Sequence, residues 1–115
     1  MQRDMDLIRA ILLEVEKNAS LAGCPVQIAG RTREDLYYNA MQAKDAGFIE
    51  AKFAPGSPDF HVIRLTYAGH EFLDALRNDT TWNKTKQIVI EKTGTLTMEG
   101  LKLAVSTLIT HAFKP

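Results

Sequence analysis

The sequence lacks the residue patterns that mark disulfide-stabilised proteins and the commonest enzymes. Cys24 is the only cysteine among 115 residues, so neither an intrachain disulfide nor a cluster of thiolate metal ligands can form. No glycine-rich loop suited to phosphate is present, and no serine or cysteine stands in a glycine-rich elbow. We therefore expect no catalytic residue, no cofactor and no resident metal, and we predict that the chain is not an enzyme.

Long hydrophobic runs and an excess of charge are missing as well. Uninterrupted apolar stretches extend over only a few residues, which is too short for a membrane span. Asp4 and Asp6 follow Met1 closely, and there is no apolar region of the signal-peptide kind, so we expect a cytoplasmic protein. The 14 basic and 14 acidic residues cancel, whereas dedicated nucleic-acid-binding domains usually carry a basic excess.

The sequence does contain enough apolar material for one globular domain over residues 1–115, with 45% apolar and 24% charged residues. Residues 4–17 predict a first helix, because apolar side chains recur there at helical spacing. Thr32 predicts the N-cap of a second helix over residues 33–46, and Gly47 stands where a left-handed residue often ends a helix. The expected buried positions are Met5, Leu7, Ile8, Ile11, Leu12 and Val15 in the first helix, and Leu36, Ala40 and Ala43 in the second.

Extended segments are expected on both sides of the second helix. Val26 and Ile28 alternate as in a short strand, after Gly23 and Pro25 have broken the chain. Residues 48–53 and 60–66 predict two strands joined by a turn rich in proline and glycine. A regular second strand would place Ile63 and Leu65 on one face and Val62 and Arg64 on the other.

Three further helices are expected after the strands, which makes the fold class α+β. Thr66 is predicted to cap a helix from Tyr67 to about Arg77, and a fourth helix begins near Thr80 or Thr81 and ends at Gly94. Trp82 in that helix is expected to be a core anchor. A last helix covers about 98–113. The domain thus divides into residues 1–66, a core with a two-stranded wing, and residues 67–115, a helical extension.

Two resemblances sharpen this description. A helix, a short strand, a helix ending in Ala46-Gly47-Phe48-Ile49 and a two-stranded wing resemble winged-helix domains. Over nearly the whole chain, the sequence also resembles an uncharacterised bacterial family, a domain of unknown function common in prophage-associated genes. The residues that carry this second resemblance are Arg3-Asp4-Met5-Asp6-Leu7-Ile8-Arg9, Leu65-Thr66, Gly69-His70-Glu71-Phe72-Leu73-Asp74, Arg77 and Trp82. The resemblance implies a relative of winged-helix domains and supplies no activity.

One departure from the winged-helix pattern concerns DNA binding. A helix-turn-helix has a further helix between the first helix and the recognition helix. Only about fifteen residues separate Lys17 from Arg33, and they include Gly23, Pro25 and Gly30. We expect the middle helix to be reduced to a turn, which removes a usual source of contacts to the DNA backbone.

A nucleic-acid-binding face is nevertheless conceivable on the second helix and the wing. Asparagine, glutamine and tyrosine side chains can contact base edges, and arginine and lysine can hold phosphates. Residues 31–47 carry three basic and three acidic side chains, so this face would gain little from counterion release. A solvated helix face explains the same residues. The candidates are Arg31, Arg33, Tyr38, Asn39, Gln42, Lys52 and Arg64, and we expect at best weak DNA binding.

His70 and Asp74 form the only pattern that suggests metal chemistry. They lie four residues apart on one helix face, as two ligands of a zinc site can. A third ligand would have to be His61 or His111, and neither has a recognisable spacing. The pattern favours a solvated pair, and a metal-dependent hydrolase centred on these two residues is the alternative function.

The last helix carries more apolar surface than one packing contact needs. Its apolar stripe has Leu103 off to one side, so hydrophobic residues cover more than half of the helix circumference. The stripe consists of Leu101, Ala104, Val105, Leu108, Ile109 and Ala112, with Phe113 close to the chain end. We therefore expect a small regulatory or interaction module that acts through protein contacts. A homodimer through the C-terminal helix and an unidentified protein partner are the expected associations, and the alternative is that the fourth helix and Trp82 cover the extra apolar face.

Overall fold

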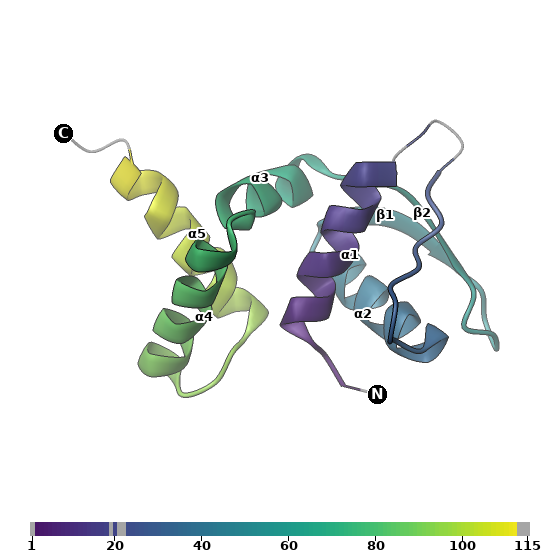
Figure 1. The fold of residues 1–115 in the computed structure, drawn as a ribbon, viewed down its shortest axis with the longest axis horizontal. Coiled ribbons are helices and arrows are strands. Elements are labelled where there is room, and N and C mark those ends of the chain that lie inside the picture. Colours follow the sequence, from purple (N-terminus) through teal and green to yellow (C-terminus); the bar gives the residue numbers. More distant parts are fainter. Residues whose placement is uncertain (1, 19, 21–22, 113–115) are drawn as a thin grey trace. The chain divides into compact units, whose positions relative to one another are not determined.

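The computed structural model describes residues 2–18, 20 and 23–112, with side chains up to residue 110, and divides the chain into two compact units, residues 1–70 and 71–115. Its fold class is α+β, as predicted (Figure 1). The described elements are α1 (Met5–Asn18), α2 (Arg33–Asp45), β1 (Ile49–Phe53), β2 (Phe60–Leu65), α3 (Tyr67–Leu76), α4 (Asp79–Thr93) and α5 (Met98–Ala112). None of the described helices is long and apolar enough to cross a membrane.

Helix α1 buries an apolar face within the first unit. The carboxylate of Asp4 accepts the backbone N–H of Leu7 at 3.1 Å, which satisfies a donor that the helix start leaves open. The helix packs against α2 and β2. All six predicted positions are buried: Met5, Leu7, Ile8, Ile11, Leu12 and Val15.

Helix α2 begins and ends as the sequence predicts. The side chain of Thr32 accepts the N–H of Asp35 at 3.1 Å, and Leu36, Ala40 and Ala43 are buried. Gly47 follows with φ of 86°, in the left-handed region that glycine occupies without strain. The chain can therefore turn sharply from α2 into the hairpin.

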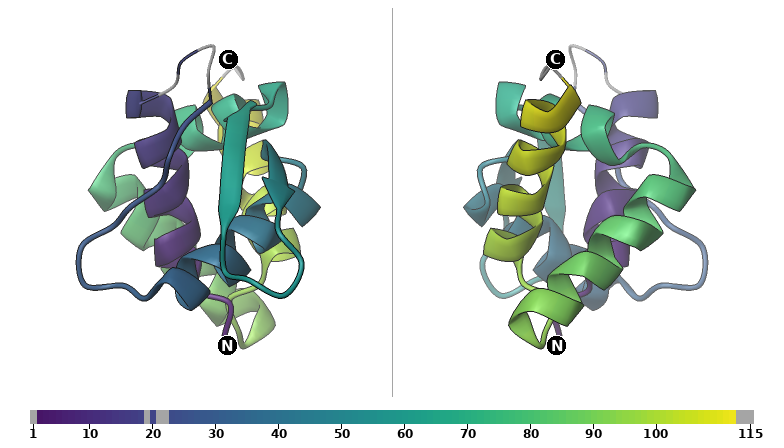
Figure 2. Two further views of the ribbon diagram at one scale, coloured as in Figure 1. Left: turned by 90° about the vertical axis from the view of Figure 1, so that its right-hand side faces the viewer. Right: turned by 90° about the vertical axis from the view of Figure 1, so that its left-hand side faces the viewer.

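The hairpin of β1 and β2 differs from the predicted alternation of faces. The two strands lie side by side in Figure 2. Glu50 pairs with Arg64, but the next residue, Ala51, pairs with Val62, so Ile63 is an extra residue in β2. Such a bulge reverses the alternation beyond it. Val62 and Leu65 are consequently both buried, while Ile63 is 38% exposed, and the predicted shared face of Ile63 and Leu65 is wrong.

The segment before α2 is extended and contacts the hairpin at one point. The N–H of Cys24 donates to the carbonyl of Val62 at 2.8 Å, a single β-bridge that lies just before the predicted strand residues Val26 and Ile28, which themselves belong to no strand. Cys24 and Val26 are buried, and burial together with the charge of Glu14 raises the pKa of the Cys24 thiol. Residues 20 and 23–32 contain no helix, so their described part agrees with the expected loss of a middle helix.

The start of α3 is fixed against the end of α2. The Thr66 hydroxyl accepts the N–H of Gly69 at 3.0 Å and donates to the carbonyl of Gly47, which confirms Thr66 as the N-cap. Gly69 is buried against the backbone of Phe48, which leaves no room for a side chain. Farther along the helix, Phe72 and Leu73 are buried, as expected of a core motif.

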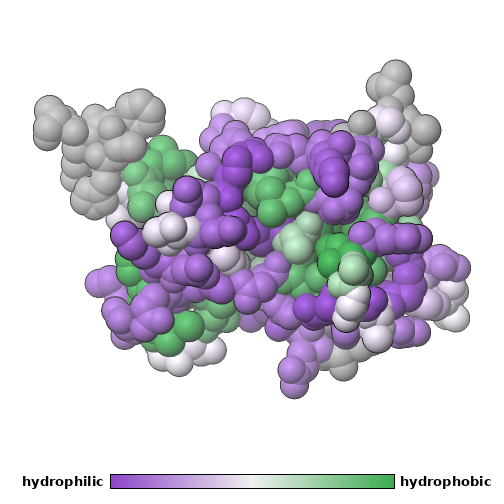
Figure 3. Space-filling model, in the orientation of Figure 1, coloured by the Kyte–Doolittle hydropathy of each residue, from purple (hydrophilic) through white to green (hydrophobic). Residues whose placement is uncertain are grey.

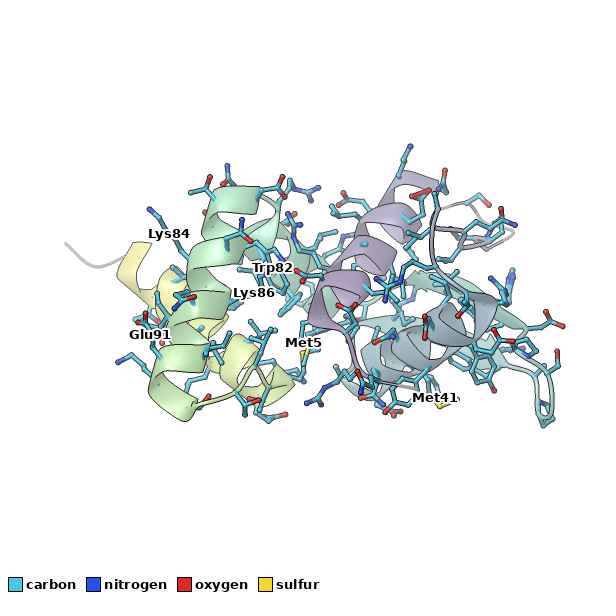
Figure 4. All side chains as sticks on the ribbon, turned by 60° about the horizontal axis from the view of Figure 1, so that its bottom comes forward. Met5, Met41, Trp82, Lys84, Lys86 and Glu91 are labelled. Carbon is cyan, nitrogen blue, oxygen red and sulfur yellow. The ribbon has the colours of Figure 1, made fainter. Side chains whose placement is uncertain are left out.

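The second unit is helical. Asn78 caps α4 by accepting the N–H groups of Thr80 and Thr81, so the helix begins one or two residues earlier than predicted. Gly94 ends it with φ of 82°. Helix α5 packs against α4. Trp82 is 3% exposed, which confirms it as a core residue, and the Nζ of Lys86 lies 5.2 Å from its ring centroid (Figure 4). The other buried residues are Leu76, Thr85, Val89, Met98, Leu101 and Val105.

Candidate interaction surfaces

The two arginines predicted to hold phosphates bind other parts of the first unit. Arg31 donates to the carboxylate of Asp4 at 2.9 Å. Arg33 donates to the carbonyl of Val26 at 2.9 Å, and its guanidinium lies 4.3 Å from the ring centroid of Phe60. Both side chains line a hollow of about 710 Å³ beside the extended segment. Since their donors are engaged within the fold, their capacity to bind a phosphate is reduced.

The Asp4–Arg31 pair has a consequence for acid stability. Burial alone would raise the pKa of the Asp4 carboxyl, but the hydrogen bonds from Arg31 and Leu7 and the charge of Arg31 together hold that pKa below its ordinary value. A carboxyl whose pKa is lower in the folded state stabilises the fold above the unfolded-state pKa and loses that effect as pH falls through the folded-state pKa.

We therefore expect the free energy of unfolding to fall more steeply for the wild type than for Asp4→Asn between about pH 5 and about pH 2. Chemical denaturation at each pH measures the difference. The Asp74→Asn variant is the matched control, because Asp74 also pairs with an arginine, at 2.7 Å, but is more exposed. Identical pH profiles for the wild type and Asp4→Asn would contradict the prediction.

Asn39 does not lie where the sequence placed it. The residue is 1% exposed, so it does not present its side chain on a solvated face of α2, as the nucleic-acid interpretation requires. Its side-chain oxygen accepts the N–H of Asp4 at 2.7 Å, and its amide donates to the carbonyls of Gln2 at 3.3 Å and Asp35 at 3.0 Å. Asn39 therefore joins the start of α1 to α2, and its base-reading groups are not available in this structure.

The remaining nucleic-acid candidates do not form a cationic surface. Tyr38 and Gln42 are half-buried on α2, and Lys52 is exposed on β1. Arg64 on β2 pairs with Glu50 at 2.7 Å, so its charge is compensated by its cross-strand neighbour. The sequence predicts these residues on the second helix and on the wing. The electrostatic potential of that surface, however, depends on which charged side chains pair with one another.

An aromatic cluster that the sequence did not suggest connects α2 to the wing. The Tyr37 ring centroid lies 5.1 Å from that of Phe53 and 6.2 Å from that of Phe60, and the two phenylalanine rings stack at 5.6 Å. The Tyr37 hydroxyl donates to the carbonyl of Ala54 at 3.0 Å. These contacts hold the hairpin against α2. They give a packing role to aromatic residues that could otherwise be interpreted as a surface on which nucleic-acid bases stack.

His70 and Asp74 are both exposed on α3, where Asp74 accepts a hydrogen bond from Arg77 at 2.7 Å. Among the described side chains, no three histidine, cysteine, aspartate or glutamate residues come together as metal ligands. His111 lies outside the residues whose side chains are described. In the described part of the chain, no third metal ligand therefore lies beside His70 and Asp74.

The second unit carries a groove between α4 and α5, with a volume of about 360 Å³. Among the described residues that line it, Lys92 alone is charged. Three threonines line it too, but the hydroxyl of each donates to a carbonyl of its own helix, at 2.7–3.0 Å. The groove therefore behaves as an apolar surface. Its residues are Thr85, Ile88, Val89, Lys92 and Thr93 on α4, and Gly100, Leu103, Ala104, Thr107 and Leu108 on α5.

Hydrophobic side chains beside this groove remain exposed. Leu103 is 70% exposed, Ile88 46% and Leu108 40%. Figure 3 shows hydrophobic surface over α4 and α5. Single exposed apolar residues are ordinary on proteins, but a contiguous set around a groove is typical of a contact surface. Sequence analysis had found the apolar excess of the last helix, whereas the groove depends on how α4 packs beside it.

The comparisons with known proteins give a family and no activity. An uncharacterized protein of Haemophilus influenzae is 35% identical over 115 aligned residues, which cover 96% of this chain and 98% of that protein. No solved structure matches the chain. A sequence family described as "Hypothetical protein (DUF2513)" matches residues 2–95. The chain therefore belongs to the DUF2513 family of hypothetical proteins.

Proposed function

We propose that this protein is a small non-enzymatic regulatory module that acts through protein contacts, with the groove between α4 and α5 as its contact surface. The observation that carries the proposal is the apolar lining of that groove together with the exposure of Leu103 and Leu108. Burying such a surface against a partner is favourable in proportion to its apolar area. The order of α1, extended segment, α2 and hairpin supports a winged-helix relationship, and the family resemblance favours a prophage origin.

The contact proposal is tested by cross-linking the tagged full-length chain in its host cells. We expect cross-linked protein adducts that disappear in Leu103→Glu/Leu108→Glu, because carboxylates in the groove would be costly to bury. Ser106→Glu, an exposed change on another part of α5, should keep them. Circular dichroism verifies that each variant is folded. Adducts that persist unchanged in the double variant would exclude the groove as the contact surface.

We expect weak, salt-sensitive binding to duplex DNA, which follows from a neutral α2 face with engaged arginines. Fluorescence anisotropy at low and at physiological salt measures it, and we expect no saturable binding at the higher salt. Tyr38→Ala/Gln42→Ala should leave the low-salt signal almost unchanged. Submicromolar binding at physiological salt that this variant abolishes would instead establish α2 as a recognition helix.

A further inference from the structure

We infer that the occupant of the α4–α5 groove is α5 of a second copy of this chain, so that the protein is a two-fold symmetric dimer. This inference rests on the proposed function, because it names the partner of the same groove. Three features of α5 support it: the spacing of its groove residues, the position of its charges and the presence of a ridge beside the groove.

Helix α5 carries two separate apolar stripes. Met98, Leu101 and Val105 are buried within the unit and form the first. The groove residues of α5 form the second, and they recur at intervals of three and four, as on a helix that packs against another helix. This second stripe consists of Gly100, Leu103, Ala104, Thr107 and Leu108. Gly100 approaches α4 within the unit, but Leu103, Thr107 and Leu108 are exposed, so the outer part of the second stripe is suited to an additional helix.

The charges of α5 are arranged as an isologous contact requires. A two-fold contact places the stripe of one copy against the same stripe of the other, so a charge on that stripe near the axis would face its own copy and repel it. Residues 103–110 contain no charged side chain. Glu99 and Lys102 occupy other positions around the helix than the second stripe. Two copies of α5 can therefore approach through this stripe without electrostatic cost.

The groove and the most exposed leucine of α5 lie on the same face, which makes the surface self-complementary. Leu103 lines the groove and is also 70% exposed, so it rises beside the hollow. In a two-fold arrangement, the leucine ridge of each copy enters the groove of the other. Gly100 contributes to the shape, because a Cβ there would lie 2.6 Å from Cγ1 of Val89, and its absence lets α5 approach α4 closely.

A different occupant is an amphipathic helix of another protein with an acidic residue facing Lys92, the one charge of the lining. Helix α5 has no acidic residue on its second stripe, so a second copy would leave Lys92 at the solvent-exposed rim. Oligomeric state separates the two occupants, because only the second copy predicts association of the purified chain.

Light scattering coupled to size exclusion, over a range of concentrations, tests the inference on the purified full-length chain. We expect a mass of twice 12.9 kDa. Leu103→Glu should weaken association by about a hundredfold or more, because it buries two uncompensated carboxylates in the contact. Since Leu103 is 70% exposed, this change leaves the fold intact, and circular dichroism checks it. The control Ser106→Glu adds the same charge outside the second stripe and should remain dimeric.

Cysteine cross-linking then tests whether α5 meets its own copy. Thr107→Cys, on the second stripe, should be joined to its copy by a short bifunctional thiol reagent, whereas Ser106→Cys, outside the stripe, should be joined much less. Cys24 is buried and should not interfere. A monomeric mass at the highest concentration, or a dimer that Leu103→Glu leaves intact, would overturn the inference. A monomer whose cross-linked adducts in host cells still depend on Leu103 and Leu108 would contradict the dimer alone and leave the proposed function standing.

Discussion

Replacing Gly69 by alanine is expected to lower the free energy of unfolding by at least about 3 kcal/mol, at the upper end of overpacking effects. The added Cβ would collide with the carbonyl oxygen of Phe48 and lie 3.0 Å from the carbonyl carbon. A backbone group cannot rotate away as a side chain can. The same carbonyl accepts the N–H of Thr66 at 2.9 Å, so moving it would also break the junction between hairpin and α3.

Urea denaturation of the full chain measures this effect. Ala68→Ser is the matched control, because it changes the exposed residue before Gly69 on the same helix and should alter the stability by no more than about 0.5 kcal/mol. If Gly69→Ala and Ala68→Ser had the same small effect, the close approach of α3 to Phe48 would not exist in solution.

The motif around Gly69 shows which structural features can be predicted from the sequence and which cannot. The capping role of Thr66 and the burial of Phe72 follow from local pattern, since capping and helical periodicity involve neighbours a few residues apart. The requirement for glycine at position 69 arises from Phe48, which is 21 residues earlier in the chain. No local pattern reports such a contact. His70 and Asp74 attracted a functional interpretation, although the buried residues beside them explain the motif without it.

Apart from the short strand expected at Val26 and Ile28, the helices and strands were predictable almost to their ends, because the caps and apolar stripes are strong. Which residues of β2 are buried could not be predicted. One extra residue, Ile63, reverses the alternation of buried and exposed side chains, and no feature of the composition indicates it. The candidate site could likewise be predicted only in part. The apolar excess of α5 is visible in the sequence, but the groove depends on how α4 packs beside α5, which the sequence does not show.

Asn39 illustrates the limit for a polar residue. On α2 it stands next to Ala40, at the border of the apolar stripe, and an asparagine there is expected to face water. The partner that keeps it inside is the start of α1, 35 residues away, whose Asp4 N–H needs an acceptor. Asn39, which we interpreted as a residue that contacts base edges, therefore stabilises the fold from within.

Asn39→Leu is accordingly expected to lower the free energy of unfolding by about 2–3 kcal/mol, because the leucine preserves most of the volume but cannot accept a hydrogen bond. The N–H of Asp4 and the carbonyl of Gln2 would lose the partners that they have at 2.7 and 3.3 Å. Gln42→Leu, at the next turn of α2 and half-buried, is the control and should change stability by less than about 0.5 kcal/mol. Thermal and urea unfolding measure both variants, and DNA anisotropy is recorded alongside. An Asn39→Leu protein of unchanged stability that had lost its DNA-binding signal would contradict the buried role and would show that Asn39 contacts DNA at the surface.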